Sequence, residues 1–196
     1  LNRNELDTVY DLHYERDYHP IYKSIGHVKA IDEVKHSIIA NRGCSGGCSF
    51  CALTYHQGRT ISARSKESIM CEAKEIVNMS DFKGYINDVG GPTANFLEPM
   101  CDKQKKHGVC KTKACLSPEC SQLKVSHKRY LDILTALRNL NEVKKVFVRS
   151  GLRYDYLMLD QNEAFFKALV EHHVSGQLRV APEHISDVVL DKMNKP

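Results

Sequence analysis

Three features are scarce in this 196-residue chain: long apolar runs, an excess of one charge, and cysteine at the density of a disulfide scaffold. No apolar run approaches the ~18 residues that a membrane-spanning helix needs, and the amino terminus is polar, so we expect a soluble, cytoplasmic protein with no membrane partner. The net charge of +4, from 28 basic and 24 acidic residues, is too weak to predict nucleic-acid binding by itself. Eight cysteines, grouped as three, one and four, instead indicate metal ligation in a reducing compartment.

The first cysteine group lies in one glycine-rich loop, Asn-Arg-Gly-Cys-Ser-Gly-Gly-Cys-Ser-Phe-Cys, which contains Cys44, Cys48 and Cys51. Three thiolates on one loop can bind a [4Fe-4S] cluster and leave one iron open, and an open coordination position is where chemistry takes place. Two other interpretations remain: a zinc site completed by His56, and a disulfide pair with one spare thiol. Zinc sites seldom need three glycines and an aromatic residue between their thiolates, so we favour the iron–sulfur cluster.

The loop resembles the cluster-binding loop of the radical S-adenosylmethionine (SAM) superfamily, Cys-x3-Cys-x-aromatic-Cys, with Phe50 in the aromatic position among the cofactor-binding residues. Over roughly residues 19–196 the chain resembles the YgiQ-type family of that superfamily. The stretches that carry this resemblance are Arg-Gly-Cys-Ser-Gly-Gly-Cys, Asp-Val-Gly-Gly-Pro-Thr-Ala-Asn, Val-Arg-Ser-Gly-Leu-Arg-Tyr-Asp and Val-Ala-Pro-Glu-His.

The resemblance implies a radical SAM enzyme that binds a [4Fe-4S] cluster and SAM and generates a 5′-deoxyadenosyl radical, which abstracts hydrogen from an unidentified substrate. It also implies an electron donor such as a flavodoxin or ferredoxin. Because the cofactor performs the difficult chemistry, we assign no catalytic side chain outside the cofactor site.

The periodicity of apolar residues predicts strands that alternate with helices. The predicted strands cover residues 36–41, 84–89, 143–149 and 177–181. The predicted helices follow Ser65 as a cap, cover residues 127–140 and 162–174, and follow Ser186 as a second cap. This βα order predicts an α/β fold with a parallel sheet.

The radical SAM resemblance implies that this sheet is a partial (β/α) barrel, of about six βα units in the family, with about four present here. We therefore expect an excerpt of a longer protein, truncated after about four βα units. The expected organisation is an N-terminal extension over residues 1–34 that wraps another part of the molecule, and an incomplete core over 35–196 with a Cys- and Lys-rich insert at 97–125.

The second signature stretch follows the second predicted strand, at the edge of the sheet where parallel α/β folds bind ligands. Gly90 and Gly91 allow close backbone approach, so main-chain carbonyls can accept hydrogen bonds from an ammonium group. The resemblance implies that Gly90, Gly91, Pro92 and Thr93 bind the methionyl amine of SAM, although Pro92 and Thr93 replace the acidic residue that often follows the two glycines. A plain turn that needs two glycines is the alternative.

The third and fourth signature stretches supply polar side chains at the same edge. Ser150 and Arg153 suit the ribose hydroxyls and the methionyl carboxylate. Glu183 corresponds by strand order to the residue that the family aims at the ribose. A structural ion pair or cap is the alternative for each, and we expect Arg179 and His184 to be supporting residues.

The second cysteine group lies in the insert beside a run of lysines. Its members are Cys101, Cys110, Cys115 and Cys120, and the lysines are Lys103, Lys105, Lys106, Lys111 and Lys113. Four thiolates can close a tetrahedral zinc site or ligate a further iron–sulfur cluster, and unligated thiols are the third interpretation. The lysines would offset the negative charge of the thiolates. They also suggest nucleic-acid contact, but a charge run beside cysteines is more often a solvated face.

Two other functions compete with the radical SAM interpretation. A zinc-binding nucleic-acid-interaction module would use both cysteine groups structurally and the lysines electrostatically, with binding that depends steeply on salt. An electron carrier is weaker, because carriers usually keep every iron ligated by the protein.

Overall fold

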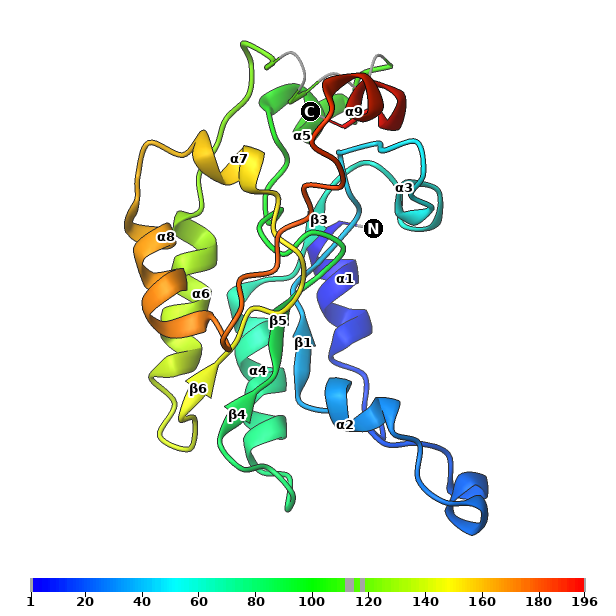
Figure 1. The fold of residues 1–196 in the computed structure, drawn as a ribbon. Helices are drawn as coiled ribbons and strands as arrows, with labels where there is room; N and C mark the ends of the chain where they lie inside the picture. The colour runs from blue at the N-terminus through cyan, green and yellow to red at the C-terminus, as the bar shows by residue number, and fades with distance from the viewer. Residues whose placement is uncertain (1, 112–114, 117–118, 196) are drawn as a thin grey trace.

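The computed structural model describes residues 2–111, 115–116 and 119–195, which form a mixed α/β fold (Figure 1). The helices are α1 (Arg3–Tyr10), η1 (Pro20–Ile25), α2 (Ala30–Val34), α3 (Leu53–His56), α4 (Lys66–Val77), α5 (Asp102–His107), α6 (Lys128–Arg138), α7 (Tyr154–Met158), α8 (Ala164–Ala168), η2 (Leu169–His173) and α9 (Asp187–Met193). The strands are β1 (Ser37–Ile39), β2 (Asn41–Arg42), β3 (Ser62–Ala63), β4 (Tyr85–Ile86), β5 (Asp88–Gly90) and β6 (Lys145–Val146).

Four parallel segments lie side by side in the order of the sequence. β1 pairs with β5, and β4 pairs with β6, both in parallel. β4 and β5 are consecutive parts of residues 85–90, which therefore lie between β1 and β6. A fourth segment continues beyond β6, where Val148 N donates to His173 O at 2.9 Å and Leu152 forms a parallel bridge with Val180. The registers are Ser37↔Asp88, Ile38↔Val89 and Ile39↔Gly90 in the first pair, and Tyr85↔Lys145 and Ile86↔Val146 in the second.

Helices α4 and α6 pack on these segments, α8 packs against α6, and the main hydrophobic core lies between the helices and the strands. Ser65 caps α4, since its hydroxyl accepts a hydrogen bond from Ser68 N at 3.1 Å. The apolar positions of α4 and α6 that sequence spacing predicts are buried: Ile69, Ala73, Ile76, Tyr130, Ile133, Leu134 and Leu137. Side chains on the other face of the strands are exposed, with Ile39 at 37%, Tyr85 at 43% and Val180 at 40%.

The structure confirms the predicted α/β class, the parallel pairing and the helices after Ser65 and over 127–140. The predicted strand at 177–181 is wrong, because only the Leu152↔Val180 bridge forms there. This segment has a neighbour on one side only among the described residues, and Pro182 has no N–H to donate to a ladder. The predicted helix at 162–174 divides into α8 and the π-helical turn η2. Strands of the described residues form no closed barrel.

The N-terminal helix α1 is fastened to the core by a buried charge network. Arg64 is fully buried and pairs with Glu72, while its Nη2 donates to Ser68 Oγ at 2.8 Å. The Tyr10 ring of α1 covers the Arg64 guanidinium at 4.2 Å, and Arg16 Nη2 approaches Glu72 Oε1 at 2.8 Å. The contacts made by Tyr10 and Arg16 join residues more than 45 positions apart, so the attachment of α1 is tertiary in origin.

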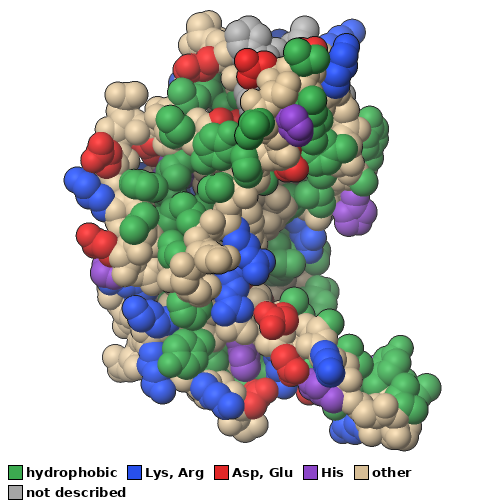
Figure 2. All heavy atoms as spheres, in the orientation of Figure 1, with side chains coloured by type: hydrophobic (Ala, Val, Ile, Leu, Met, Phe, Trp, Pro, Cys, Tyr) green, Lys and Arg blue, Asp and Glu red, His purple; other side chains and the backbone are tan. Residues whose placement is uncertain are grey.

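Beyond α1, the chain extends into a lobe that contains η1 and projects from the body. Figure 2 shows hydrophobic side chains on this lobe, and Ile21, Tyr22 and Ile25 are 67%, 44% and 79% exposed. Across the described part of the chain, the helices are too short or too polar to span a bilayer.

Candidate functional site

The cysteine loop follows β2 and is supported from behind by residues 57–60. Cys44 N donates to Gly58 O at 3.1 Å, and Gly43 N donates to Gln57 Oε1 at 3.3 Å. Gly43 has φ +82°, and a Cβ at this position would collide with the carbonyl oxygen of Thr60. Glycine at position 43 therefore lets the chain turn into the loop.

Two of the three thiols of this loop converge on Gly46. A Cβ at Gly46 would lie 3.4 Å from Cys44 Sγ and 3.7 Å from Cys48 Sγ. Cys44 is buried, Cys48 and Cys51 are half-buried, and Cys51 N donates to Cys48 O at 3.2 Å. Burial raises the pKa of Cys48, the Arg153 cation opposes this, and the charges of Cys44 and Cys51 raise the pKa further. The three sulfurs are thus close enough to act on one another.

The described residues contain no three His, Cys, Asp or Glu side chains arranged to hold one metal ion. A [4Fe-4S] cluster poses a different geometric demand, because its three cysteines bind three different irons. Their sulfurs stand farther apart than the ligands of a single ion. Among the described residues, neither cysteine group is therefore preformed for a single ion.

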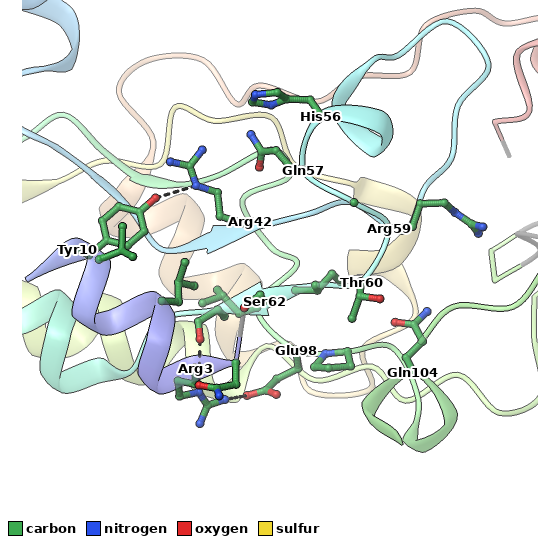
Figure 3. A pocket seen from close by; sticks show the side chains of 18 of the residues that line it. Arg3, Tyr10, Arg42, His56, Gln57, Arg59, Thr60, Ser62, Glu98 and Gln104 are labelled. Carbon is green, nitrogen blue, oxygen red and sulfur yellow. Dashed lines mark hydrogen bonds and ion pairs between the residues drawn. The ribbon is translucent and has the colours of Figure 1, made fainter. Parts of the chain in front are cut away.

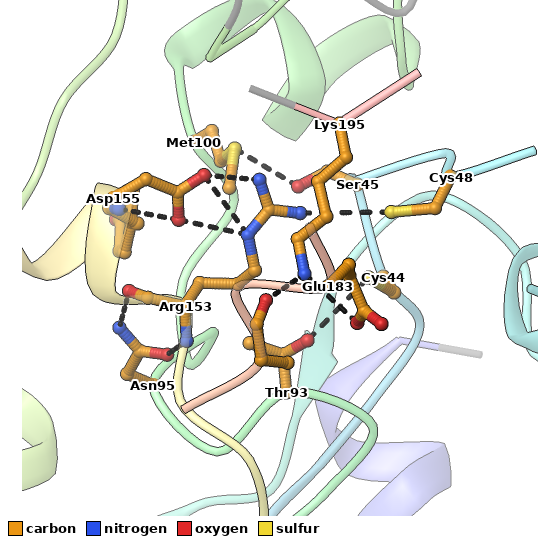
Figure 4. A network of polar contacts seen from close by, with 12 residues as sticks. Cys44, Ser45, Cys48, Thr93, Asn95, Met100, Arg153, Asp155, Glu183 and Lys195 are labelled. Atoms are coloured by element: carbon orange, nitrogen blue, oxygen red, sulfur yellow. Dashed lines mark hydrogen bonds and ion pairs between the residues drawn. The ribbon is translucent and has the colours of Figure 1, made fainter. Parts of the chain in front are cut away.

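Arg153 reaches the cysteine loop from the start of α7 (Figure 4). Its side chain is buried, and Nη1 donates to Cys48 Sγ at 3.9 Å. Asp155 accepts hydrogen bonds from Nε at 2.9 and 3.1 Å and pairs with Nη2, while the side chain of Asn95 bonds both the N–H and the C=O of Arg153. Burial lowers the pKa of the guanidinium, but the hydrogen bond and charge of Asp155 raise it overall. A fixed cation therefore lies beside the thiols.

The two glycines after β5 make close contacts within the protein. Gly90 O accepts a hydrogen bond from Ala40 N at 2.6 Å. A Cβ at Gly91 would lie 2.7 Å from Asn41 O and 2.8 Å from Asn41 Cγ. Gly91 is thus required for packing against the strand that leads into the cysteine loop, whereas a Cβ at Gly90 would collide with the Ser150 side chain.

Thr93 lies on the inner side of the same turn, and Pro92 beside it is half-buried. Thr93 Oγ1 is 3.6 Å from Cys44 Sγ, so its hydroxyl is placed at the first thiol. Phe50 is 54% exposed, with its ring available to a partner at the outer side of the loop.

Ser150 and Glu183 each have a partner within the chain. The Ser150 hydroxyl donates to Asp88, and Ser150 N donates to Asp88 Oδ1 at 3.0 Å. Glu183 Oε1 accepts from Lys195 Nζ at 3.0 Å, and Glu183 has a left-handed φ of +67°. The structure brings Arg153 and Thr93 to the thiols and engages Ser150 and Glu183 in local contacts.

Several residues at the loop were missed by sequence reasoning. Asn95 and Asp155 lie inside two of the signature stretches, so the signal for them was present. Lys195 is buried, and its charge lowers the pKa of Cys48, while Asn194 Nδ2 donates to Gly47 O at 2.8 Å. Nothing in the local sequence singles out these last two residues. The predicted supporting residues make local contacts: Arg179 O accepts from Leu152 N at 3.1 Å, and His184 Nδ1 accepts from Ser186 N at 2.9 Å.

Comparison with known proteins identifies the family. A family model described as Radical SAM N-terminal matches residues 1–37. A UPF0313 protein of Clostridium perfringens is 59% identical over 197 residues, which cover 100% of this chain and 30% of that protein. A UPF0313 protein of Clostridium botulinum is also 59% identical over 197 residues, which cover 31% of its length. The chain belongs to the UPF0313 family. This is the YgiQ-type radical SAM-like family, so the predicted resemblance is confirmed.

The UPF0313 chain spans about 30% of the length of these relatives. The N-terminal match covers α1, η1 and α2 and ends at the first residue of β1. The residues predicted as an extension therefore coincide with a segment that has its own family model.

A cavity of about 1180 Å³ lies between α1 and the antiparallel pair of strands β2 and β3 (Figure 3). Arg3, Arg42 and His56 line it, and Arg42 Nε donates to Tyr10 Oη at 2.8 Å. None of the three loop cysteines lines this cavity. It lies behind the loop, so it is distinct from the strand-end site where the thiols and Arg153 meet.

The second cysteine group lies around α5, on the other side of residues 57–60. Burial raises the pKa of Cys115, and the charges of Cys120, Cys101 and Cys110 raise it further, so the four sulfurs are near one another. Cys115 also packs against the hydrophobic cluster that contains Cys44. The two cysteine groups are therefore neighbours in space. Lys113 lies outside the described residues.

Proposed function

We propose that this UPF0313 chain carries the cluster loop of a radical SAM enzyme of unknown substrate, with Cys44, Cys48 and Cys51 as ligands of a [4Fe-4S] cluster and SAM as the cofactor. The observation that supports it most directly is the convergence of Cys44 and Cys48 on Gly46 beside a fixed Arg153 cation. The match of residues 1–37 to the Radical SAM N-terminal family supports the same assignment.

The donor set fits a cluster. Three soft thiolates ligate three irons, and the fourth iron is left for a chelating cofactor. A Cβ at Gly46 would lie 2.8 Å from Arg153 Nη1, so glycine is needed for the guanidinium to lie against the loop. A cation and N–H donor at Cys48 stabilises a thiolate and adjusts the potential of a cluster bound there.

The cluster and SAM together supply reductive homolysis of the C5′–S bond, and the protein residues bind and orient them. We assign Phe50, Gly90, Gly91, Pro92, Thr93, Ser150, Arg153 and Glu183 to the cofactor site. Arg153 keeps its charge through Asp155, so it can attract the methionyl carboxylate or the cluster thiolates. Ser150 retains acceptor capacity after it donates to Asp88, which leaves a hydrogen bond for a ribose hydroxyl.

The fold that we propose for the chain is a partial (β/α) barrel. Parallel sheets are normally covered on both faces, whereas Ile39, Tyr85 and Val180 lie on a face that no helix of the described residues covers. The sequential order of the four parallel segments is the order of a (β/α) barrel. An electron donor such as a flavodoxin or ferredoxin would approach the side of the loop where Phe50 is exposed.

The test uses the complete gene product that contains this sequence, reconstituted with iron and sulfide without oxygen. We expect an iron–sulfur absorption spectrum that SAM perturbs, and release of 5′-deoxyadenosine after reduction. Cys48→Ser should abolish both, whereas Cys71→Ser is the matched control because Cys71 is exposed on α4.

Two outcomes would contradict the proposal. Iron content that is the same in the Cys48→Ser variant and in the unmodified protein would remove the loop as the cluster site. Zinc without iron, together with oligonucleotide binding that weakens steeply with salt, would favour the nucleic-acid module instead.

A further inference from the structure

The second cysteine group is organised by one buried glutamine. Gln104, in α5, is 2% exposed, and its N–H donates to Cys101 Sγ at 3.5 Å. Its side-chain Nε2 donates to Cys115 Sγ at 3.7 Å, while its Oε1 accepts from Met100 N at 3.0 Å. The bond to Met100 fixes the amide orientation, so the NH₂ group faces the sulfur. N–H donors of this kind are typical of the surroundings of metal-bound thiolates.

Backbone contacts link the third and fourth cysteines. Cys120 N donates to Cys115 O at 3.0 Å, and Leu116 and Glu119 form an antiparallel bridge. These two contacts keep Cys115 and Cys120 close to each other. The group of four therefore comes from the start of α5 (Cys101), the segment after that helix (Cys110) and the linked pair Cys115 and Cys120.

Arg59 places a buried positive charge at the same location. Its Nη1 donates to Cys110 O at 3.2 Å. Its Nε and Nη2 are buried and have no hydrogen-bond partner among the described residues. Leaving such donors unpaired costs about 1–3 kcal/mol each, and more for a charged group. The thiolates of this group, Cys115 among them, are negatively charged acceptors close to Arg59.

We propose that Cys101, Cys110, Cys115 and Cys120 form a closed zinc site, with Arg59 and Gln104 as positioning residues that support the thiolates. Zinc binds four thiolates tetrahedrally, and each thiol releases its proton to solvent on binding. The complex of Zn²⁺ with four thiolates carries two negative charges. Arg59 and the neighbouring Lys103, Lys105 and Lys106 offset them.

Zinc suits this location better than a second iron–sulfur cluster. The backbone N–H of Gln104 donates to Cys101 Sγ and its side-chain amide donates to Cys115 Sγ, so one buried residue bridges two sulfurs, an arrangement that a single ion disturbs less than a bulky cubane. The four sulfurs do not yet surround one point among the described residues, so binding requires them to move closer together.

The site would have a structural consequence for the cluster loop. Residues 57–60 carry Arg59 on one side and accept the Cys44 N–H through Gly58 O on the other. Zinc at the second group therefore fixes the segment that supports the first. The proposal does not depend on radical SAM activity, because zinc content is measured separately from iron.

The experiment measures zinc and iron in the complete gene product, purified without oxygen. We expect one zinc per chain, lost in Cys115→Ser and in Cys120→Ser, with iron loading at the first group retained. Cys48→Ser should show the reverse pattern, and Cys71→Ser should change neither metal. Unchanged zinc in Cys115→Ser and in Cys120→Ser, with native circular dichroism, would overturn the zinc assignment.

A cobalt(II) probe covers the case in which a serine variant fails to fold. Replacing zinc by cobalt should give an intense thiolate-to-cobalt absorption band. Cys120→His keeps a metal ligand, so the band should weaken and shift while the metal stays bound; an unchanged band would refute ligation by Cys120.

The role of Arg59 has its own readout. Arg59→Gln should speed the chelator-driven release of zinc by about 10-fold or more, and Arg59→Lys should restore part of the difference, because a cation is regained. A release rate that Arg59→Gln leaves unchanged would rule out Arg59 as a positioning residue.

Discussion

Replacing Gly91 by alanine tests whether the turn after β5 is fixed by packing. The new Cβ would lie 2.7 Å from the Asn41 carbonyl oxygen and 2.8 Å from its Cγ. Asn41 is fully buried, and its Nδ2 donates to Phe96 O at 2.6 Å and to Thr93 O at 3.2 Å. The alanine can therefore be accommodated only if a buried, hydrogen-bonded residue moves.

The magnitude follows from two contributions. Overpacking of a buried site costs about 1–3 kcal/mol. Loss of the two Asn41 hydrogen bonds adds about 1 kcal/mol each. We expect Gly91→Ala to lower the free energy of unfolding by about 3–5 kcal/mol, a large part of the ~5–15 kcal/mol that stabilises a typical protein.

The assay is urea denaturation followed by circular dichroism, with Gly151→Ala as the matched control. A Cβ at Gly151 meets no heavy atom within 4 Å, so that variant should stay within about 0.5 kcal/mol of the unmodified protein. A loss below about 1 kcal/mol for Gly91→Ala would refute the reasoning. The turn would then have room that the structure does not show.

Three further predictions concern buried charge. Arg64→Leu should destabilise the protein by about 3 kcal/mol in urea denaturation, the lower end for a broken buried pair, because Glu72 keeps a second arginine partner; no loss would contradict the anchoring of α1. Burial lowers the pKa of His173 to about 4, below the usual 6.5, so the unfolded chain protonates first. Stability should fall by about 3 kcal/mol as the pH drops from about 6.5 to 4, and His173→Gln should flatten that profile. Arg153→Gln should speed chelator-driven iron release from the reconstituted protein by about 10-fold, because the donor at Cys48 is lost; an unchanged rate would count against this role.

Local patterns were sufficient for much of the fold. The spacing of Ile69, Ala73 and Ile76 predicted one buried helix face, and the structure buries all three. The hydroxyl of Ser65 caps that helix as its position predicted. Short strands were harder to predict, because a two-residue pairing such as β6 depends on the neighbours that the sheet supplies rather than on its own residues.

The antiparallel pairing of β2 with β3 was not predicted from the sequence. Its two strands have two residues each, and they flank the cysteine loop and α3. Strands this short are too brief to show an alternation of apolar and polar residues in the sequence. The same reason explains why the network that fastens α1 through Arg64 and Tyr10 was not foreseen.

The sequence by itself determined the chemistry that the chain can offer: the Cys-x3-Cys-x2-Cys loop with its glycines, the four cysteines of the insert, and the βα order. These follow from residue type and spacing along the chain. Only the tertiary structure decided that Arg153 lies at Cys48, that Arg59 lies between the two cysteine groups, and that Gly91 packs against Asn41. Such contacts join residues 50 to 105 positions apart, so they depend on how the helices and strands pack and leave no local pattern to detect.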